Sequence, residues 1–272
     1  MVGSLEGRVA FITGAARGQG RAHAVRLARD GADIIGVDIC ADIASMDYPN
    51  ATADDLAETV ALVEREGRRM IAAQADVRDA VGLAAAFESA HRRLGRLDII
   101  IANAGIVRLT EEIDPHAEWT DIIATNLTGV FNTVRAALPA MQAGGRGGSI
   151  VITSSSAGLK GTASDKAGAQ AYTAAKRGLV GYMQVLANDL AAQWIRVNTI
   201  HPTGVATGMV MNEAMLRLAA DPNGSMAAMQ NALPIEILQP EDIANAVAWL
   251  VSDEARFITG VALPLDAGFS IR

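Results

Sequence analysis

The sequence predicts a doubly wound α/β protein of the Rossmann type, with a seven-stranded parallel sheet and helices on both faces. Short runs rich in β-branched residues alternate with longer, alanine-rich amphipathic stretches, which is the order of a βαβ protein. Several runs are continuously apolar, as expected for strands covered by helices on both sides. The expected strands are Arg8–Thr13, Asp33–Asp38, Arg69–Gln74, Leu97–Ala102, Ser149–Thr153, Ile195–Ile200 and Val261–Leu265.

The segments between these strands have the length and composition of helices. We expect helices over Arg21–Asp30, Asp54–Glu66, Val81–Leu94, Trp119–Met141 and Ala171–Ala192, with one more helix before the last strand. The length of 272 residues suits one α/β domain spanning 1–272.

Two connections exceed what a short loop needs, an insertion at about 39–53 and a segment at about 203–238. Both follow carboxyl ends of strands, where ligands bind in a doubly wound fold. The second segment holds five of the ten methionines, which indicates a pliable apolar substrate lid, although helix packing would produce the same pattern. These methionines are Met209, Met211, Met215, Met226 and Met229.

Composition narrows the possible partners and the compartment. The net charge of −7 would repel a phosphate backbone, so nucleic acid is not an expected partner. The single cysteine, Cys40, allows no internal disulfide. The sequence shows no secretion signal at its start and no apolar run long enough to span a membrane, so we expect a cytoplasmic protein.

A glycine-rich turn follows the first strand and opens a helix. The segment Thr13–Gly20 contains Gly14, Gly18 and Gly20, with Arg17 and Gln19 between them. Glycines let backbone amides approach an anion at a helix N-terminus, so the turn suits a pyrophosphate. Such spacing alone is a weak signal, and a merely structural turn is the alternative.

Asp38 ends the second strand eighteen positions after Gly20. An acidic residue at that spacing accepts hydrogen bonds from an adenosine ribose and repels a 2′-phosphate, which favours NAD over NADP. Arg17 in the glycine turn favours NADP instead, because a guanidinium can pair with a 2′-phosphate. A helix cap or a solvated strand-end carboxylate is the alternative for Asp38.

Tyr172 and Lys176 lie four positions apart in a helical stretch, so they share one face and the ammonium can stabilise a phenolate. The chain has three Tyr and three Lys, so chance would give such a pair only about 0.03 times. Lys176 and a cationic nicotinamide would both lower the pKa of the tyrosine. Spacing does not choose among Ser154, Ser155 and Ser156 for the hydroxyl that holds the substrate oxygen.

Together the TGAARGQG turn, the Asn103-Ala104-Gly105 tripeptide, Asn126, the serine run and the Tyr172-xxx-Lys176 pair resemble the classical short-chain dehydrogenases/reductases over essentially the whole chain. The resemblance implies a catalytic tetrad of Asn126, Ser155, Tyr172 and Lys176. The spacing of seventeen residues between Ser155 and Tyr172 is longer than usual in that family, which leaves Ser154 and Ser156 open.

The same resemblance implies the residues that bind the cofactor. They are Gly14, Arg17, Gly18, Gln19, Gly20, Asp38, Asp76, Val77, Asn103, Ala104, Gly105, Tyr172, Lys176, Val205 and Thr207. Asp76 and Val77 would contact adenine, and Thr207 would bind the carboxamide. The sequence departs from the family at Thr203, where a glycine usually follows the proline.

The insertion resembles that of the carveol-dehydrogenase-like, mycofactocin-coupled subgroup, which implies a hydrophobic secondary alcohol substrate. It also implies that NAD stays buried and passes its electrons to a peptide-derived redox partner. A loop beside the ribose carboxylate could cover the adenosine and slow its exit, but a surface excursion unrelated to the cofactor is the alternative. The family is commonly tetrameric, packed through the fifth and sixth helices and the C-terminal strand, so we expect a homotetramer.

The four histidines share no metal-ligand spacing, and no catalytic metal is predicted. His201 is interpreted as a hydrogen-bonded residue at a strand end. Two other functions remain open: an NADPH-dependent carbonyl or acyl-thioester reductase, which Asp38 opposes, and an NAD-binding sensor or scaffold without turnover, since a fold alone does not establish chemistry.

Overall fold

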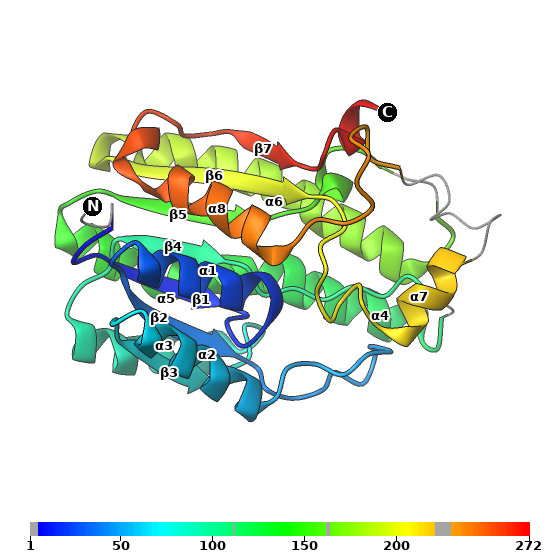
Figure 1. The fold of residues 1–272 in the computed structure, drawn as a ribbon, viewed down its shortest axis with the longest axis horizontal. Helices are drawn as coiled ribbons and strands as arrows, with labels where there is room; N and C mark the ends of the chain where they lie inside the picture. Colours follow the sequence, from blue (N-terminus) through cyan, green and yellow to red (C-terminus); the bar gives the residue numbers. More distant parts are fainter. Residues whose placement is uncertain (1–4, 111, 162–163, 221–229) are drawn as a thin grey trace.

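A computed structural model describes residues 5–110, 112–161, 164–220 and 230–272 of the protein. Seven parallel strands form one sheet in the order β3-β2-β1-β4-β5-β6-β7 (Figure 1). The strands are β1 (Val9–Thr13), β2 (Asp33–Asp38), β3 (Met70–Gln74), β4 (Ile99–Ala102), β5 (Gly148–Thr153), β6 (Ile195–Pro202) and β7 (Ala262–Leu265). All seven overlap the expected strands, and the predicted fold class is confirmed.

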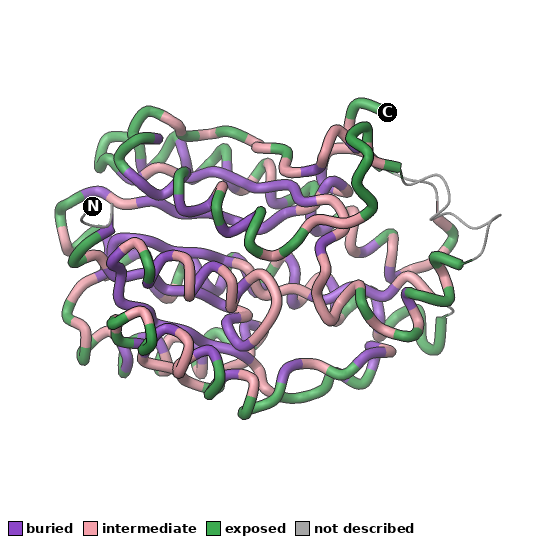
Figure 2. Tube along the Cα trace, in the orientation of Figure 1, coloured by how far each residue is buried: buried purple, intermediate pink, exposed green. Residues whose placement is uncertain are grey.

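Helices cover both faces of the sheet, which explains why β1, β2 and β4 are buried along their whole length. Figure 2 shows the buried residues running along these strands. One face packs against α1 (Gly18–Arg29), α2 (Ala53–Arg65) and α8 (Pro240–Val251). The other face packs against α3 (Ala80–Leu94), α5 (Gly129–Gly144) and α6 (Ala167–Leu190).

The helix expected over Trp119–Met141 differs from the structure. The chain forms α4 (Pro115–Ile123), then a π-helical turn over Ala124–Thr128, and then α5. Asp114 caps α4 by accepting from the next backbone N–H groups. A π-helical turn inserts one extra residue into the helical repeat, which changes the direction of the side chains after it. Periodicity over the whole segment therefore predicted one helix where the structure has two.

The segment after β6 also contains more structure than a loop. It includes α7 (Glu213–Ala220), whose first turn is capped by the side-chain oxygen of Asn212, which accepts from the Met215 N–H at 3.0 Å. Met215 is buried, whereas Met211 is half exposed. The proposed lid at 203–238 lies partly outside the described residues, and so do Met226 and Met229.

The strand order reverses between β1 and β4, and both neighbours end at the same edge of the sheet. A crevice opens at such a point because the two connecting chains leave the sheet toward opposite faces. The glycine turn follows β1 there, and Asn103 follows β4. No described helix has the length and apolar character needed to cross a membrane.

Candidate functional site

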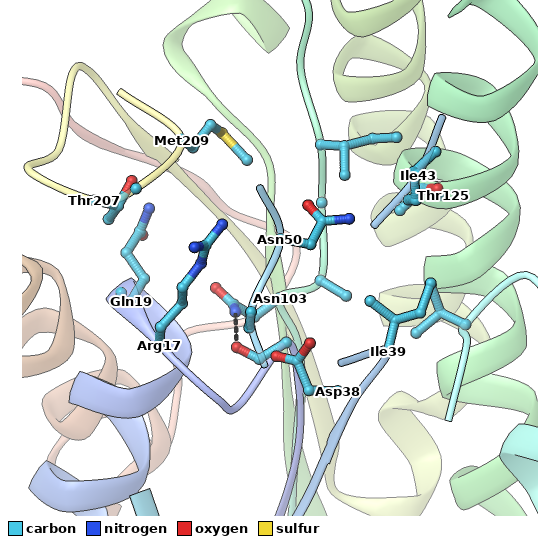
Figure 3. A pocket seen from close by; sticks show the side chains of 18 of the residues that line it. Arg17, Gln19, Asp38, Ile39, Ile43, Asn50, Asn103, Thr125, Thr207 and Met209 are labelled. Carbon is cyan, nitrogen blue, oxygen red and sulfur yellow. Dashed lines mark hydrogen bonds between the residues drawn. The ribbon is translucent and has the colours of Figure 1, made fainter. Parts of the chain in front are cut away.

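A pocket lies at this edge of the sheet, between the glycine turn, the ends of β2 and β4, and the segment after β6. Figure 3 shows Thr207 and Met209 on one side of it and Ile43 and Thr125 on the other. Eleven of the residues predicted to bind the cofactor line this one pocket: Gly14, Arg17, Gly18, Gln19, Asp38, Asp76, Val77, Asn103, Ala104, Gly105 and Thr207. Gly20, Tyr172, Lys176 and Val205 are not part of its lining.

The glycine turn is shaped by contacts that no larger residue permits. A Cβ on Gly20 would lie 1.8 Å from the carbonyl oxygen of Gly14, so α1 starts directly against the turn. Gly14 has φ +67°, and its Cβ would lie 2.9 Å from the Cα of Ala104. Asn103 donates from Nδ2 to the Thr13 carbonyl at 3.1 Å, which holds the ends of β1 and β4 together. The backbone is therefore free to approach a ligand.

Asp38 is buried at the end of β2, where its carboxylate accepts from the backbone N–H of Ala16 at 2.9 Å. Burial raises the pKa of Asp38, and the bonds from Ala16 and neighbouring N–H groups oppose this rise. The guanidinium of Arg17 donates to the carbonyl of Pro49 in the insertion at 2.6 Å. Arg17 is thus engaged by the insertion, which limits its use as a partner for a 2′-phosphate.

Asp76 and Val77 follow β3 and line the pocket beyond Asp38. Arg78 pairs with the Asp76 carboxylate at 2.7 Å and with Asp121 on α4 at 2.8 Å. Val77 is buried, and its carbonyl accepts from Nδ2 of Asn132 on α5 at 2.8 Å. Both residues are therefore held in place by the rest of the fold.

Two buried polar atoms at the pocket have no hydrogen-bond partner among the described residues. They are Oε1 of Gln19 on α1 and Oγ1 of Thr125 in the π-helical turn. A buried oxygen without a partner is costly unless a ligand or water completes it. The glycine turn, these two oxygens and the Asp38 carboxylate together fit a dinucleotide with a ribose diol.

Tyr172 lies on the first turns of α6, and its hydroxyl is hydrogen-bonded to the Ser155 side chain. The Ser154 hydroxyl instead donates to the Lys176 carbonyl at 2.8 Å and is buried. Ser156 is also buried, at the start of a short 3₁₀ turn. Of the three serines that spacing left open, Ser155 is the one that the structure joins to Tyr172.

Lys176 is buried one turn after Tyr172, with Nζ 5.6 Å from the centre of the tyrosine ring. Its Nζ donates to the Thr153 carbonyl at 2.7 Å. Asn126 lies in the π-helical turn and exchanges two hydrogen bonds with the backbone of Ile106, at 2.9 and 2.7 Å. A Cβ on Gly105 would lie 2.8 Å from Asn126 Oδ1 and 3.5 Å from Lys176 Nζ, so all three groups meet at one place.

Burial is the main influence on the pKa values of Lys176 and Tyr172. It lowers the pKa of Lys176 to about 7. It raises the pKa of Tyr172, and the hydrogen bond from Ser155 opposes that rise. The protein groups alone therefore do not give the lowered tyrosine pKa that the sequence predicted, because burial of Tyr172 outweighs its hydrogen bond with Ser155.

The insertion at about 39–53 contributes pocket residues that the sequence did not identify. Ile43, Tyr48, Asn50 and Ala51 line the pocket, with Met209 opposite them. Tyr48 is buried, and its hydroxyl accepts from the Val107 N–H at 3.1 Å. The sequence offered a path of the insertion over the adenosine as one of two interpretations, but it did not indicate which side chains of the insertion would line the pocket.

Polar contacts fasten the insertion to α4. The Ser45 hydroxyl donates to the Asp121 carboxylate at 2.6 Å, and Asp121 also pairs with Arg78. The Ser45 carbonyl accepts from Arg108 at 3.2 Å, and Arg108 pairs with the buried Glu118 on α4 at 3.2 Å. These contacts show that the insertion is packed against the protein rather than projecting from its surface.

No three His, Cys, Asp or Glu side chains gather in metal-binding geometry within the described part of the chain. His201 is fully buried and bonded through both ring nitrogens, which confirms its interpretation as a hydrogen-bonded residue at a strand end.

Comparison with known proteins identifies the family to which the chain is similar. Residues 8–216 match the model of the short chain dehydrogenase family. The chain is 47% identical to (-)-trans-carveol dehydrogenase of Rhodococcus erythropolis, over 98% of this chain and 99% of that protein. It is 56% identical to an uncharacterized oxidoreductase of Mycobacterium tuberculosis, over 97% of each chain.

Solved structures agree with these sequence matches. The structure of carveol dehydrogenase from Mycobacterium avium in complex with NAD superposes with a TM-score of 0.93 at 46% identity, over 99% of this chain and 100% of that one. A short chain dehydrogenase from Mycobacterium paratuberculosis bound to NAD gives a TM-score of 0.91 at 44% identity, with the same coverage.

Proposed function

Because the chain belongs to the short-chain dehydrogenase family, we propose that it is an NAD(H)-dependent oxidoreductase that interconverts a hydrophobic, carveol-like secondary alcohol and its ketone. The observation that carries this proposal is the hydrogen bond between Ser155 and Tyr172, with Lys176 buried one turn further along α6. A sensor or scaffold without turnover would have no use for this arrangement.

NAD is supported by the pocket itself and by the NAD complexes of the two structural relatives. The glycine turn would hold the pyrophosphate, and Asp38 would accept hydrogen bonds from the adenosine ribose. Asp76 and Val77 would border the adenine, while Asn103, Ala104, Gly105, Val205 and Thr207 would border the nicotinamide half. A buried carboxylate at position 38 opposes an NADPH-dependent reductase, because it would repel the 2′-phosphate.

The proton follows a path through side chains that the structure brings together. When bound, NAD would accept the hydride that leaves the carbinol carbon with its bonding electron pair. Ser155 would hold the substrate oxygen by a hydrogen bond, and Tyr172 as a phenolate would take the hydroxyl proton, leaving the ketone. The Lys176 ammonium would stabilise the phenolate, and Asn126 would fix the backbone of Ile106 beside it.

An apolar substrate is supported by the residues around Tyr172. One cluster of hydrophobic side chains includes Ile106, Ile122 and Ala171, together with Tyr48 of the insertion, and Tyr172 and Met209 pack against it. A terpenoid alcohol would bury its hydrocarbon surface here at roughly 25 cal/mol per Å². Part of the proposed lid would complete the pocket.

We further propose that the insertion retains the cofactor, so that NADH is re-oxidised in place by a redox partner of the mycofactocin type. The contacts of Arg17 with Pro49 and of Ser45 with Asp121 support this, because both must break before the insertion can move away from the pocket. Closure of a loop over a ligand slows its release.

The oligomer is proposed to be a homotetramer. On α5 and α6, Phe131 is 47% exposed and Val185 is 67% exposed, and the Phe131 ring lies 6.0 Å from that of Tyr182. Large apolar side chains on helix faces favour association with another copy. Light scattering of the purified protein gives the mass directly, and a monomer would contradict this proposal.

The function is tested by mixing the protein with excess NAD and carveol and following the absorbance of reduced nicotinamide. Continuous formation of NADH would support a dehydrogenase that exchanges its cofactor. A burst that stops at about one reduced cofactor per subunit would support retained NAD that awaits another acceptor. Absence of reduction with carveol and with other apolar secondary alcohols would contradict the proposed activity.

A further inference from the structure

His201 lies at the end of β6, fully buried, and is not among the residues assigned to the reaction. Its Nδ1 lies 2.8 Å from the backbone carbonyl oxygen of Ser155. Its Nε2 lies 2.8 Å from the hydroxyl of Thr199, which is also fully buried. Both nitrogens therefore have one partner each, and the partner of Nδ1 belongs to the serine that contacts Tyr172.

The partners determine which nitrogen of His201 carries the proton. A carbonyl oxygen only accepts hydrogen bonds, so Nδ1 must carry the hydrogen that points to Ser155. Burial lowers the pKa of His201, while the hydrogen bond to Ser155 and the charge of Asp266 oppose this effect, and the net direction favours the neutral ring. Nε2 is then an acceptor, and the Thr199 hydroxyl donates to it. The Ser155 carbonyl thus fixes the tautomer, and the Thr199 hydroxyl, which can donate or accept, completes the bonding of Nε2.

The segment that carries Ser155 has few other attachments to β6. The backbone N–H of Ser154 donates to the Ile200 carbonyl at 2.9 Å, and the next attachment to β6 is the bond from His201. Apart from the hydrogen bond of its side chain with Tyr172, the other described hydrogen bonds of Ser155 are local to its own turn: its carbonyl accepts from the Gly158 N–H at 2.8 Å, and its hydroxyl accepts from the Ala157 N–H at 3.2 Å. Without His201, no other described residue outside this turn would hold the Ser155 carbonyl.

We propose that His201 is a positioning residue that holds Ser155 in place against Tyr172 through its Nδ1–H, while Thr199 occupies its Nε2. The inference rests on the proposed function only for its catalytic consequence. It assigns His201 no contact with substrate and no proton transfer. Its effect is on the geometry of the Ser155–Tyr172 pair, because small displacements of a catalytic group are costly in rate.

Two substitutions separate the hydrogen bond from the volume of the side chain. His201→Phe keeps a ring of similar size and removes the donor, whereas His201→Asn is smaller but keeps an N–H close to the Nδ1 position. We expect His201→Phe to lower kcat by about 10–100-fold with the Kd for NAD unchanged. His201→Asn is expected to recover most of that loss, although it leaves a larger void.

A kinetic isotope effect distinguishes positioning from a loss of stability. The substrate is an alcohol deuterated at the carbinol carbon, and misalignment should make hydride transfer more rate-limiting. The isotope effect on kcat should therefore be larger in His201→Phe than in the unaltered protein, and in His201→Asn it should be close to that of the unaltered protein. Wild-type kcat in His201→Phe would overturn the proposal. So would equal losses in both variants with a lowered Tm and an unchanged isotope effect, since these would indicate a purely structural role.

A second measurement needs no turnover, so its failure is distinguishable from failure of the proposed function. Protein with carbon-13 at tyrosine Cζ gives three signals, since the chain has three tyrosines, and Tyr172→Phe assigns the one from Tyr172. We expect this signal to shift in His201→Phe, because the bond from Ser155 is disturbed, and to keep its position in His201→Asn. An unchanged signal in His201→Phe would overturn the proposal even if the protein oxidised no alcohol.

Discussion

Lys176 Nζ donates a hydrogen bond to the carbonyl of Thr153 at 2.7 Å, which ties α6 to the end of β5 beside Tyr172. The bond fixes the position of the amine while burial lowers its pKa to about 7. A lysine held in this way can supply or lose a proton near neutral pH, which a solvated lysine cannot do. The arrangement is therefore suited to acid–base chemistry rather than to a structural ion pair.

Lys176→Met tests this role. Removal of the amine should lower kcat for alcohol oxidation by about 10²–10⁴-fold, because the ammonium that would stabilise the Tyr172 phenolate is lost. Lys166→Met, at the residue that precedes α6, is the matched control and should keep its kcat. Comparable activity of the two variants in steady-state assays would show that Lys176 is dispensable.

Asp38→Asn tests the choice of coenzyme. The amide oxygen of Asn can still accept from the Ala16 N–H, but the charge that repels a 2′-phosphate is lost. We expect the ratio of kcat/KM with NADP to kcat/KM with NAD to rise at least about tenfold, since the charge repulsion at this position is removed. Asp38→Ala should give a similar ratio with lower stability, because the buried N–H loses its acceptor. A ratio unchanged in both variants would place the ribose elsewhere.

Ser45→Ala tests whether the insertion retains the cofactor. The variant loses the 2.6 Å bond to Asp121, a hydrogen bond to a charged group worth about 1.5–3 kcal/mol. If that bond closes the insertion, the rate of NADH release should rise about tenfold or more, since each 1.4 kcal/mol corresponds to a factor of ten. Displacement of NADH by excess NAD, followed by fluorescence, gives the rate.

The control for this experiment is Ser89→Ala, at an exposed position on α3 far along the chain from the insertion. It should release NADH at the rate of the unaltered protein. Equal release rates in Ser45→Ala and Ser89→Ala would indicate that the Ser45–Asp121 bond does not limit cofactor exchange.

Local sequence patterns were sufficient to predict those features of the fold and the site that depend on local interactions or on the order of strands in the sheet. Continuous apolar runs such as Ile99–Ile101 predicted buried strands, and the ends of β1 and β4 then had to meet at one edge. The four-residue spacing of Tyr172 and Lys176 likewise predicted their shared face on α6. These features depend on the periods of helices and strands, which a sequence displays directly.

Features that depend on the path of the chain in space could not be predicted in this way. Tyr48 lines the pocket, where its hydroxyl accepts from the backbone of Val107, 59 positions away. The choice of Ser155 over Ser154 depends on the Ser154 hydroxyl being used by the carbonyl of Lys176. The π-helical turn around Asn126 shifts the helical repeat by one residue, which average periodicity does not reveal.

His23 provides a prediction about stability rather than activity. It is fully buried on α1, and neither ring nitrogen has a partner among the described residues. Burial lowers the pKa of His23 from 6.5 to about 4. Between these values the unfolded chain binds a proton that the folded protein does not, so the free energy of unfolding decreases as the pH falls. At pH 5 this loss is about 2 kcal/mol.

His23→Leu removes the titrating group, and it also removes two buried polar atoms that lack partners. The variant should therefore be at least as stable as the unaltered protein at pH 7.5, and its advantage should grow by about 2 kcal/mol at pH 5. Urea unfolding at the two pH values measures the difference. His116→Leu, at an exposed histidine on α4, is the control and should keep the original pH dependence. If His23→Leu lost as much stability as the unaltered protein between pH 7.5 and 5, another group would have to cause the acid sensitivity.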